Sequence, residues 1–187
     1  METFFIADTH FNHDREFIYR VRGFNNIQEM NTAIINNWNN AISCNDQVYF
    51  LGDFFLGTDE EFILDTINGL NGEIHLILGN HDTNKKIELY KTIPKIKEIV
   101  YATKIVHNKR EIMLSHYPMM TASLESDPKQ ATFGIHGHVH TVNKFYEGRP
   151  YMYNVSCDAQ KCRPINIEDA LAEMNEEIKK CFASVAD

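Results

Sequence analysis

In the first half of the chain, the pattern of hydrophobic and polar positions switches between that of buried strands and that of amphipathic helices. Short apolar runs at residues 3–7, 47–51 and 74–78 are bounded by polar or turn residues, as buried strands are. Between these runs, apolar side chains recur at helical spacing over residues 27–43 and 58–69. Strands that alternate with helices in this way predict a parallel sheet flanked by helices, so we expect an α/β fold.

After Pro94 the pattern becomes mainly that of β structure. Residues 99–106 and 111–114 flank the polar turn Asn108-Lys109-Arg110, which predicts a hairpin. The other expected elements are a helix over 85–90, strands over 132–135, 151–155 and 163–167, and an amphipathic helix from Glu168 onward. No linker or repeat interrupts the pattern, so we expect one domain over residues 1–187.

The composition is that of an ordinary soluble globular protein, with 43% hydrophobic and 24% charged residues. The formal charge of −8 disfavours unspecific binding to long nucleic acid, which needs a basic surface. It leaves open a nucleotide or a short oligonucleotide held by metal ions. The pattern does not indicate an oligomeric state.

The cysteines and the first residues bear on the compartment. The four cysteines have no paired CxxC spacing, which favours reduced thiols over a disulfide framework. The first residues lack the pattern of a signal peptide, and no apolar run approaches the length of a membrane span. We therefore expect a cytoplasmic protein without a membrane partner.

Side chains that can bind metal follow the ends of several apolar runs. Asn80, His81 and Asp82 follow Gly79 directly after the run at 74–78. In a parallel α/β sheet, ligands collect beyond the carboxyl ends of the strands. The alternative interpretation is a turn with an Asx cap on the next helix.

Asp8 and His10 follow the first run in the same way. On extended backbone, side chains two residues apart share a face, so both could point at one ion. The alternative is that Asp8 caps a helix and His10 is merely exposed. The complete set of such residues at strand ends is Asp8, His10, Asp53, Asn80, His81, His116, His138 and His140.

Mixed imidazole and carboxylate ligands suit Mn, Fe, Zn or Ni and would be unusual for calcium. One ion cannot accommodate this many side chains, whereas two ions that share a carboxylate can. The alternation in His138-Val139-His140 supplies two imidazoles on one face, and Gly137 allows close approach of the backbone.

Along the chain, these residues form the ordered motifs Asp8-Thr9-His10, Gly52-Asp53, Gly79-Asn80-His81-Asp82, His116 and Gly137-His138-Val139-His140. The series resembles that of the calcineurin-like metallophosphoesterases, and most closely that of the small single-domain bacterial and phage phosphoesterases. Each motif alone is weak, but the ordered series is specific. The resemblance implies an α/β/β/α sandwich of two mixed β-sheets flanked by helices.

The resemblance also implies a site with two divalent metal ions, most often Mn, with Fe, Zn or Ni as alternatives. Asp8, His10 and His140 would hold one ion, Asn80, His116 and His138 the other, and Asp53 would bridge them. His81 would stand outside the metal shell, where it would donate a proton to the leaving oxygen or a hydrogen bond to the phosphoryl group. Asp82 would orient His81 or cap the following helix. His81, Asp53 and Asn80 are thus the expected catalytic residues.

The implied reaction is hydrolysis of a phosphodiester or phosphomonoester in a small phosphoester or nucleotide-type substrate. Two ions roughly 3.5–4 Å apart lower the pKa of a bridging water, so that hydroxide is available near neutral pH. Candidate substrate contacts are Asn12, His13, Arg22 and Tyr117, each with a surface or packing role as the alternative. The alternative function is a non-catalytic protein-interaction module on the same fold.

Overall fold

The structure is a computed structural model that describes residues 1–122 and 126–183; residues 123–125 and 184–187 of the expected domain lie outside the described residues. Five strands form the first sheet, in the order β4-β3-β2-β1-β9. They are β1 (Thr3–Ile6), β2 (Gln47–Leu51), β3 (Glu73–Ile77), β4 (Ile96–Val100) and β9 (Ile165–Asn166). Strands β1 to β3 run parallel, as predicted, β4 is also parallel to β3, and β9 pairs antiparallel with β1.

The second sheet has the order β5-β6-β7-β8. Its strands are β5 (Ala102–His107), β6 (Arg110–Ser115), β7 (Phe133–His136) and β8 (Met152–Asn154). The hairpin of β5 and β6 turns through Asn108 and Lys109, both with positive φ (49° and 65°), as a tight two-residue turn requires. Because β6, β7 and β8 are parallel, this sheet is mixed as well.

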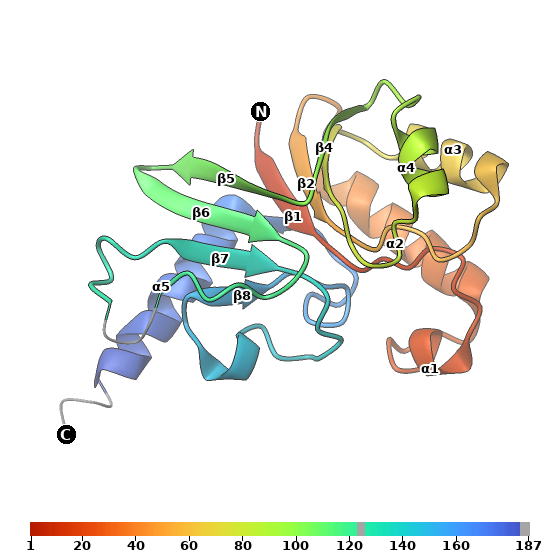
Figure 1. Cartoon of the computed structure of the whole chain (residues 1–187). Helices are drawn as coiled ribbons and strands as arrows, with labels where there is room; N and C mark the ends of the chain where they lie inside the picture. Colours follow the sequence, from red (N-terminus) through yellow and green to blue (C-terminus); the bar gives the residue numbers. More distant parts are fainter. Residues whose placement is uncertain (123–125, 184–187) are drawn as a thin grey trace.

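The helices lie on the outside of these sheets (Figure 1). They are α1 (Glu16–Tyr19), α2 (Ile27–Ala41), α3 (Glu60–Gly69), α4 (Asn84–Tyr90) and α5 (Ile167–Ala183), with a 3₁₀ turn η1 (Tyr146–Gly148). Helix α2 begins where the Asn26 side chain accepts a hydrogen bond from the Glu29 N–H (2.8 Å), and the Asp59 side chain caps α3 in the same way. Within residues 1–122 and 126–183, no helix is both long and apolar enough to cross a membrane.

Successive side chains of the strands in the first sheet point to opposite faces, and each face contributes to one of two apolar clusters. Phe4 and Phe50 point to one face and pack with Trp38 of α2 in the cluster that also includes α3 and α4. Phe5 and Leu51 point to the other face, in a cluster shared with the second sheet and α5. The fold is therefore the sandwich of two mixed sheets flanked by helices that the sequence predicted.

One predicted strand is wrong. The apolar stretch 99–106 is divided at Tyr101, which is 76% exposed. The part before Tyr101 belongs to β4 and pairs with β3, whereas the part after it is β5 and pairs with β6. The chain therefore crosses from the first sheet to the second inside what reads as one strand.

Both sheets bring strand ends to the same edge. The parallel strands β1, β2 and β3 end together, and backbone hydrogen bonds join their ends to the second sheet. The Ala7 N–H donates to the Val155 carbonyl (3.0 Å), and the Cys157 N–H donates to the Ala7 carbonyl (2.9 Å), so the end of β1 is bonded to the segment that follows β8. Polar residues that follow these strands consequently gather at one place.

Candidate metal centre

The candidate ligands are presented by left-handed backbone. Asp8, His10, Asp53 and His138 all have positive φ, between 47° and 66°, a region that non-glycine residues seldom adopt. The sequence-based reason for pairing Asp8 with His10, two residues apart on extended backbone, is therefore wrong, although the two side chains do converge. The N–H groups of Asp8 and His10 donate to the carbonyls of Gly52 (3.0 Å) and Asp53 (3.2 Å), which ties the loop after β1 to the loop after β2.

Two glycines allow these loops to come close. A Cβ atom added to Gly79 would collide with the carboxylate of Asp53, and one added to Gly137 would collide with the carboxylate of Asp8. Only glycine fits at these two positions without moving a candidate ligand.

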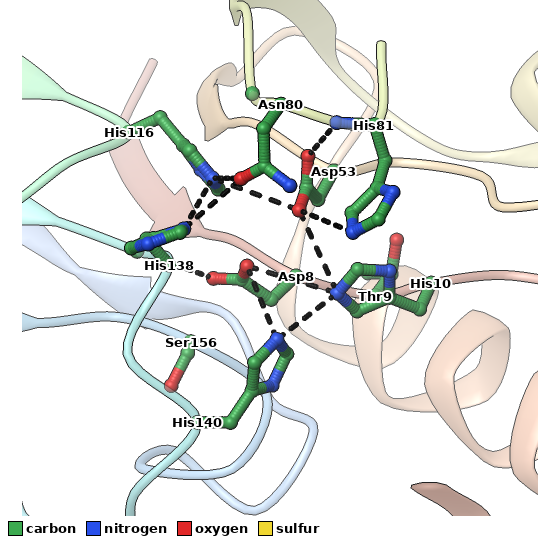
Figure 2. Close-up of polar contacts among 12 residues, drawn as sticks. Asp8, Thr9, His10, Asp53, Asn80, His81, His116, His138, His140 and Ser156 are labelled. Atoms are coloured by element: carbon green, nitrogen blue, oxygen red, sulfur yellow. Dashed lines mark hydrogen bonds and ion pairs between the residues drawn. The ribbon is translucent and has the colours of Figure 1, made fainter.

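The first group of candidate ligands is Asp8, His10 and His140, whose ligand atoms lie within 4.8 Å of one another. The Asp8 Oδ1 atom is 3.9 Å from His10 Nε2 and 4.0 Å from His140 Nε2. The two imidazole nitrogens face each other at 3.2 Å (Figure 2).

The second group is Asn80, His116 and His138. The Asn80 Oδ1 atom is 3.0 Å from both His116 Nε2 and His138 Nδ1, and these two nitrogens are 3.2 Å apart. Asp53 lies between the groups, because its Oδ2 atom is 3.6 Å from His116 Nε2 and 3.8 Å from His10 Nε2 (Figure 2). We call these seven residues, the three of each group together with Asp53, the candidate metal centre.

The polar atoms at this centre fit a cation. Asp8 Oδ1 is buried and has no hydrogen-bond partner among the described residues. Burial raises the pKa of Asp8 to about 8 and lowers the pKa of His10 to about 2, so a carboxylate here lacks compensation and the imidazole stays neutral. His116 donates Nδ1–H to the Leu51 carbonyl (2.8 Å), which leaves the lone pair of its Nε2 directed at the centre. Converging lone pairs and an uncompensated carboxylate are the donor set of a divalent metal site.

Arg22 lies beneath the centre and not at its surface. Its side chain is 2% exposed, and its guanidinium forms a two-bond ion pair with Asp158 (3.1 and 2.9 Å). It also donates to the carbonyls of Thr9 (3.0 Å) and Asp8 (2.8 Å). A further contact runs from its Nη1 to the Met30 sulfur (3.8 Å), so every N–H of the guanidinium has a partner within the protein. This contradicts the sequence-based expectation of an anion-binding role for Arg22.

Asp158 connects Arg22 to the candidate ligand His140. Its Oδ2 atom accepts a hydrogen bond from His140 Nδ1 at 2.8 Å. Burial alone would raise the pKa of Asp158, but hydrogen bonds from His140 and Arg22 hold it well below the usual range. Sequence analysis missed this residue, although it follows the strand predicted at 151–155 and the rule applied to the other strand ends would have found it.

Asp82 joins two loops of the centre. Its Oδ2 atom accepts hydrogen bonds from the N–H groups of Asp53 (2.9 Å) and Gly79 (2.8 Å), and Tyr90 donates its hydroxyl to Oδ1 (3.3 Å). Asp82 therefore fixes the backbone of Asp53, and neither of the roles expected from sequence, orienting His81 or capping α4, is seen.

His81 is close to the centre and open to solvent. Its side chain is 46% exposed, with Nε2 at 3.9 Å from Asp53 Oδ2, and its N–H donates to Asp53 Oδ1 (2.8 Å). Its ring meets that of His10 edge-on at 5.4 Å. This position allows His81 to reach a group bound at the centre.

The other three candidate substrate contacts lie at the rim of the centre. Asn12 is exposed and hydrogen-bonds with Asn31 through its side chain (3.4 Å). The ring of His13 is 5.8 Å from that of His10. Tyr117 is 51% exposed, with its ring 4.6 Å from the ring of His138.

The comparison with protein families agrees with this geometry. The family model described as the calcineurin-like phosphoesterase superfamily domain matches residues 1–160 of the chain. The chain belongs to this superfamily. Its membership confirms the family resemblance drawn from the ordered motifs.

The chain is similar to an archaeal protein and to several proteins of solved structure. It is 34% identical over 170 residues to an uncharacterized protein of Methanocaldococcus jannaschii, covering 88% of this chain and 86% of that protein. Among solved structures, it is similar to a protein of unknown function from Aquifex aeolicus, with a TM-score of 0.68, 26% identity and coverage of 90% and 96% of the two chains. A novel archaeal phosphodiesterase shares the fold, with a TM-score of 0.50, 17% identity and coverage of 89% and 99%.

Proposed function

We propose that this superfamily member hydrolyses a phosphodiester or phosphomonoester with the help of two divalent metal ions. Mn is the metal that we propose first, and Fe, Zn or Ni are the alternatives. The observation that carries the proposal is the position of Asp53 Oδ2, 3.6 Å from His116 Nε2 of one ligand group and 3.8 Å from His10 Nε2 of the other. A carboxylate shared by two ligand groups is what a two-metal site requires.

We assign the residues as follows: Asp8, His10 and His140 hold one ion, Asn80, His116 and His138 hold the other, and Asp53 contacts both. Bound ions supply charge neutralisation of the phosphoryl oxygens and a water of lowered pKa. The uncompensated Asp8 carboxyl and the neutral imidazole of His10 described above support this assignment.

His81 is the proposed proton donor. As the oxygen of water forms a bond to phosphorus and the water releases a proton to solvent, the bond from phosphorus to the leaving oxygen breaks, and protonated His81 supplies from Nε2 the proton that this oxygen takes up. The exposure of His81 and its link through its N–H to Asp53 support this role, because the ring is accessible yet held next to the centre. Asp53 and Asn80 contribute by positioning this segment and the ligand groups.

The proposed substrate is a small phosphoester or nucleotide, contacted at the rim by Asn12, His13 and Tyr117. We assign Arg22 to positioning Asp8 and, through Asp158, His140. The competing function is a non-catalytic interaction module, which does not need a complete ligand set around Asp53.

The test is hydrolysis of bis-p-nitrophenyl phosphate and p-nitrophenyl phosphate by apoprotein reloaded with Mn, Ni, Zn or Mg. We expect turnover of the diester that depends on the added metal and falls by roughly 100-fold or more in His81→Ala, with the bound metal retained. Absence of turnover with every metal, despite two bound ions per chain, would favour the interaction module. Equal activity of wild type and His81→Ala would refute the role of His81.

A further inference from the structure

Two exposed aromatic side chains adjoin the candidate metal centre. The exposed large aromatic side chains of the described residues are Phe17, Tyr101, Tyr117 and Phe182. Single exposed apolar residues are normal and need no explanation. Two of these four, however, are linked by ring contacts to the rings of candidate ligands, and that placement points to a ligand.

Tyr117 stands on one side of the centre. Its ring is 5.1 Å from that of His116 and 4.6 Å from that of His138, while half of the side chain remains open to solvent. The backbone here is held in place, because Ser115 donates its hydroxyl to the Tyr117 carbonyl (2.7 Å). Tyr117 therefore presents a fixed planar surface next to the second ligand group.

Phe17 stands on the side of the first ligand group. Its phenyl ring is 67% exposed and meets the ring of His13 edge-on at 5.7 Å. The ring of His13 is in turn 5.8 Å from that of His10, which contacts the ring of His81 at 5.4 Å. A continuous path of rings thus leads from the proposed proton donor to the exposed phenyl group.

The ring contacts of Tyr117 and of Phe17 lead to candidate ligands on opposite sides of the shared carboxylate. Figure 2 shows His116 and His138 on one side of Asp53 and Asp8, and His10 and His81 on the other. A phosphoryl group held by ions at the centre would therefore have the ring contacts of Tyr117 on one side and those of Phe17 on the other. Only a diester carries a substituent for each of them, because a monoester has a leaving group alone.

Resting on the proposed function, we propose that the substrate is a phosphodiester with a planar ring, such as a nucleobase or an aryl group, on each side of phosphorus. The leaving group lies on the side of the proton donor His81, against His13 and Phe17. The retained substituent stacks on Tyr117. Stacking on an aromatic side chain is sequence-tolerant and is lost on truncation to alanine.

The test compares variants on three p-nitrophenyl diesters with the same leaving group. The retained substituent is p-nitrophenyl, 5′-thymidyl or methyl, and the protein is loaded with Mn²⁺. The ratio of kcat/KM between variant and wild type cancels the intrinsic reactivity of each ester. We expect Tyr117→Ala to lower kcat/KM about 10-fold more for the ring-bearing substituents than for the methyl ester, with Tyr117→Phe close to wild type for all three esters.

Phe17→Ala should lower kcat/KM by a similar factor for all three esters, since all share the leaving ring. Phe182→Ala, an exposed aromatic residue at the end of α5, is the matched control and should change none of them. If Tyr117→Ala lowers kcat/KM for the thymidyl ester alone, the retained substituent is a nucleobase. If it lowers kcat/KM for both ring-bearing esters, any planar ring serves as the retained substituent. Equal ratios for the methyl and ring-bearing esters would overturn the proposal, and turnover of the methyl ester would still uphold the proposed hydrolase.

Discussion

Replacement of Asp158 by asparagine tests whether the ion pair beneath the centre positions a metal ligand. The carboxylate of Asp158 accepts a hydrogen bond from His140 Nδ1 (2.8 Å) and two from Arg22 (3.1 and 2.9 Å). Asparagine keeps the size of the side chain and one acceptor oxygen, but it removes the negative charge. The change therefore isolates the electrostatic part of the arrangement.

The expected size follows from burial. The side chains of Arg22 and Asp158 are 2% and 11% exposed, so solvent screens their attraction little. Loss of one partner of a buried pair costs about 3–5 kcal/mol, and the remaining acceptor reduces this to about 2–3 kcal/mol. In a domain of this size, that corresponds to a fall of about 5–10 °C in Tm. Loss of an outer partner of a ligating histidine lowers metal affinity about 10- to 100-fold.

The assay is a competition titration of Mn²⁺ into apoprotein, with thermal unfolding of the same samples. The control is Glu173→Gln, which also removes a carboxylate bound to two partners, Lys144 (2.7 Å) and the Tyr153 hydroxyl (2.6 Å). We expect the control to lose stability and to keep its Mn²⁺ affinity. If Asp158→Asn lowers Tm by this amount but binds Mn²⁺ like wild type, the positioning role is refuted and the pair serves stability alone.

Three further predictions concern other parts of the molecule. Lys86 is 3% exposed and donates to the carbonyls of Phe55, Leu56 and His81. Lys86→Met should lower the free energy of unfolding, measured with urea, by about 2–3 kcal/mol because these buried acceptors lose their donor. An unchanged free energy of unfolding would contradict this. Hydrogen bonds from the N–H groups of Glu2 and Ser43 lower the pKa of Asp46 in the folded state, so its contribution to stability is present above about pH 4–5 and is lost as pH falls below about 4. The gap in urea midpoint between wild type and Asp46→Asn should therefore narrow from pH 6 to pH 3, and a constant gap would refute the assignment. Metal removal with a chelator should lower Tm reversibly, because the free energy of unfolding falls by about 2.7 kcal/mol for each ion that had been present at 100 times its Kd. Mn²⁺ affinity should fall as pH falls because protons compete for the ligands.

The order of motifs was enough to predict the family and most of the fold. Each motif follows an apolar run of strand length, and parallel strands end at a common edge, so convergence of Asp8, Asp53 and Asn80 followed from sequence. The division of residues 99–106 between two sheets did not follow, because an apolar run has the same appearance whichever sheet its two halves join. Pairing across sheets is a property of long-range packing and leaves no mark in local periodicity.

The support of the site was harder to predict than the site itself. Arg22 appeared to be an exposed anion binder, because an arginine beside a glycine gives no sign that a carboxylate 136 positions away will bury it. Asp158 carries no motif of its own. Partners of this kind are found by distance in the folded chain, whereas the ligands could be found by position after strands.

The left-handed backbone at Asp8, His10, Asp53 and His138 sets the fold and the proposed chemistry in competition. Each such residue costs about 1 kcal/mol relative to glycine, which adopts these angles freely. A glycine in place of any of the four would relax the apoprotein while removing a ligand. Selection for thermal stability in the absence of metal would therefore discard the centre, and selection in the presence of metal would keep it. The residues that make this chain a candidate enzyme are thus among those that a search for the most stable version of its fold would replace first.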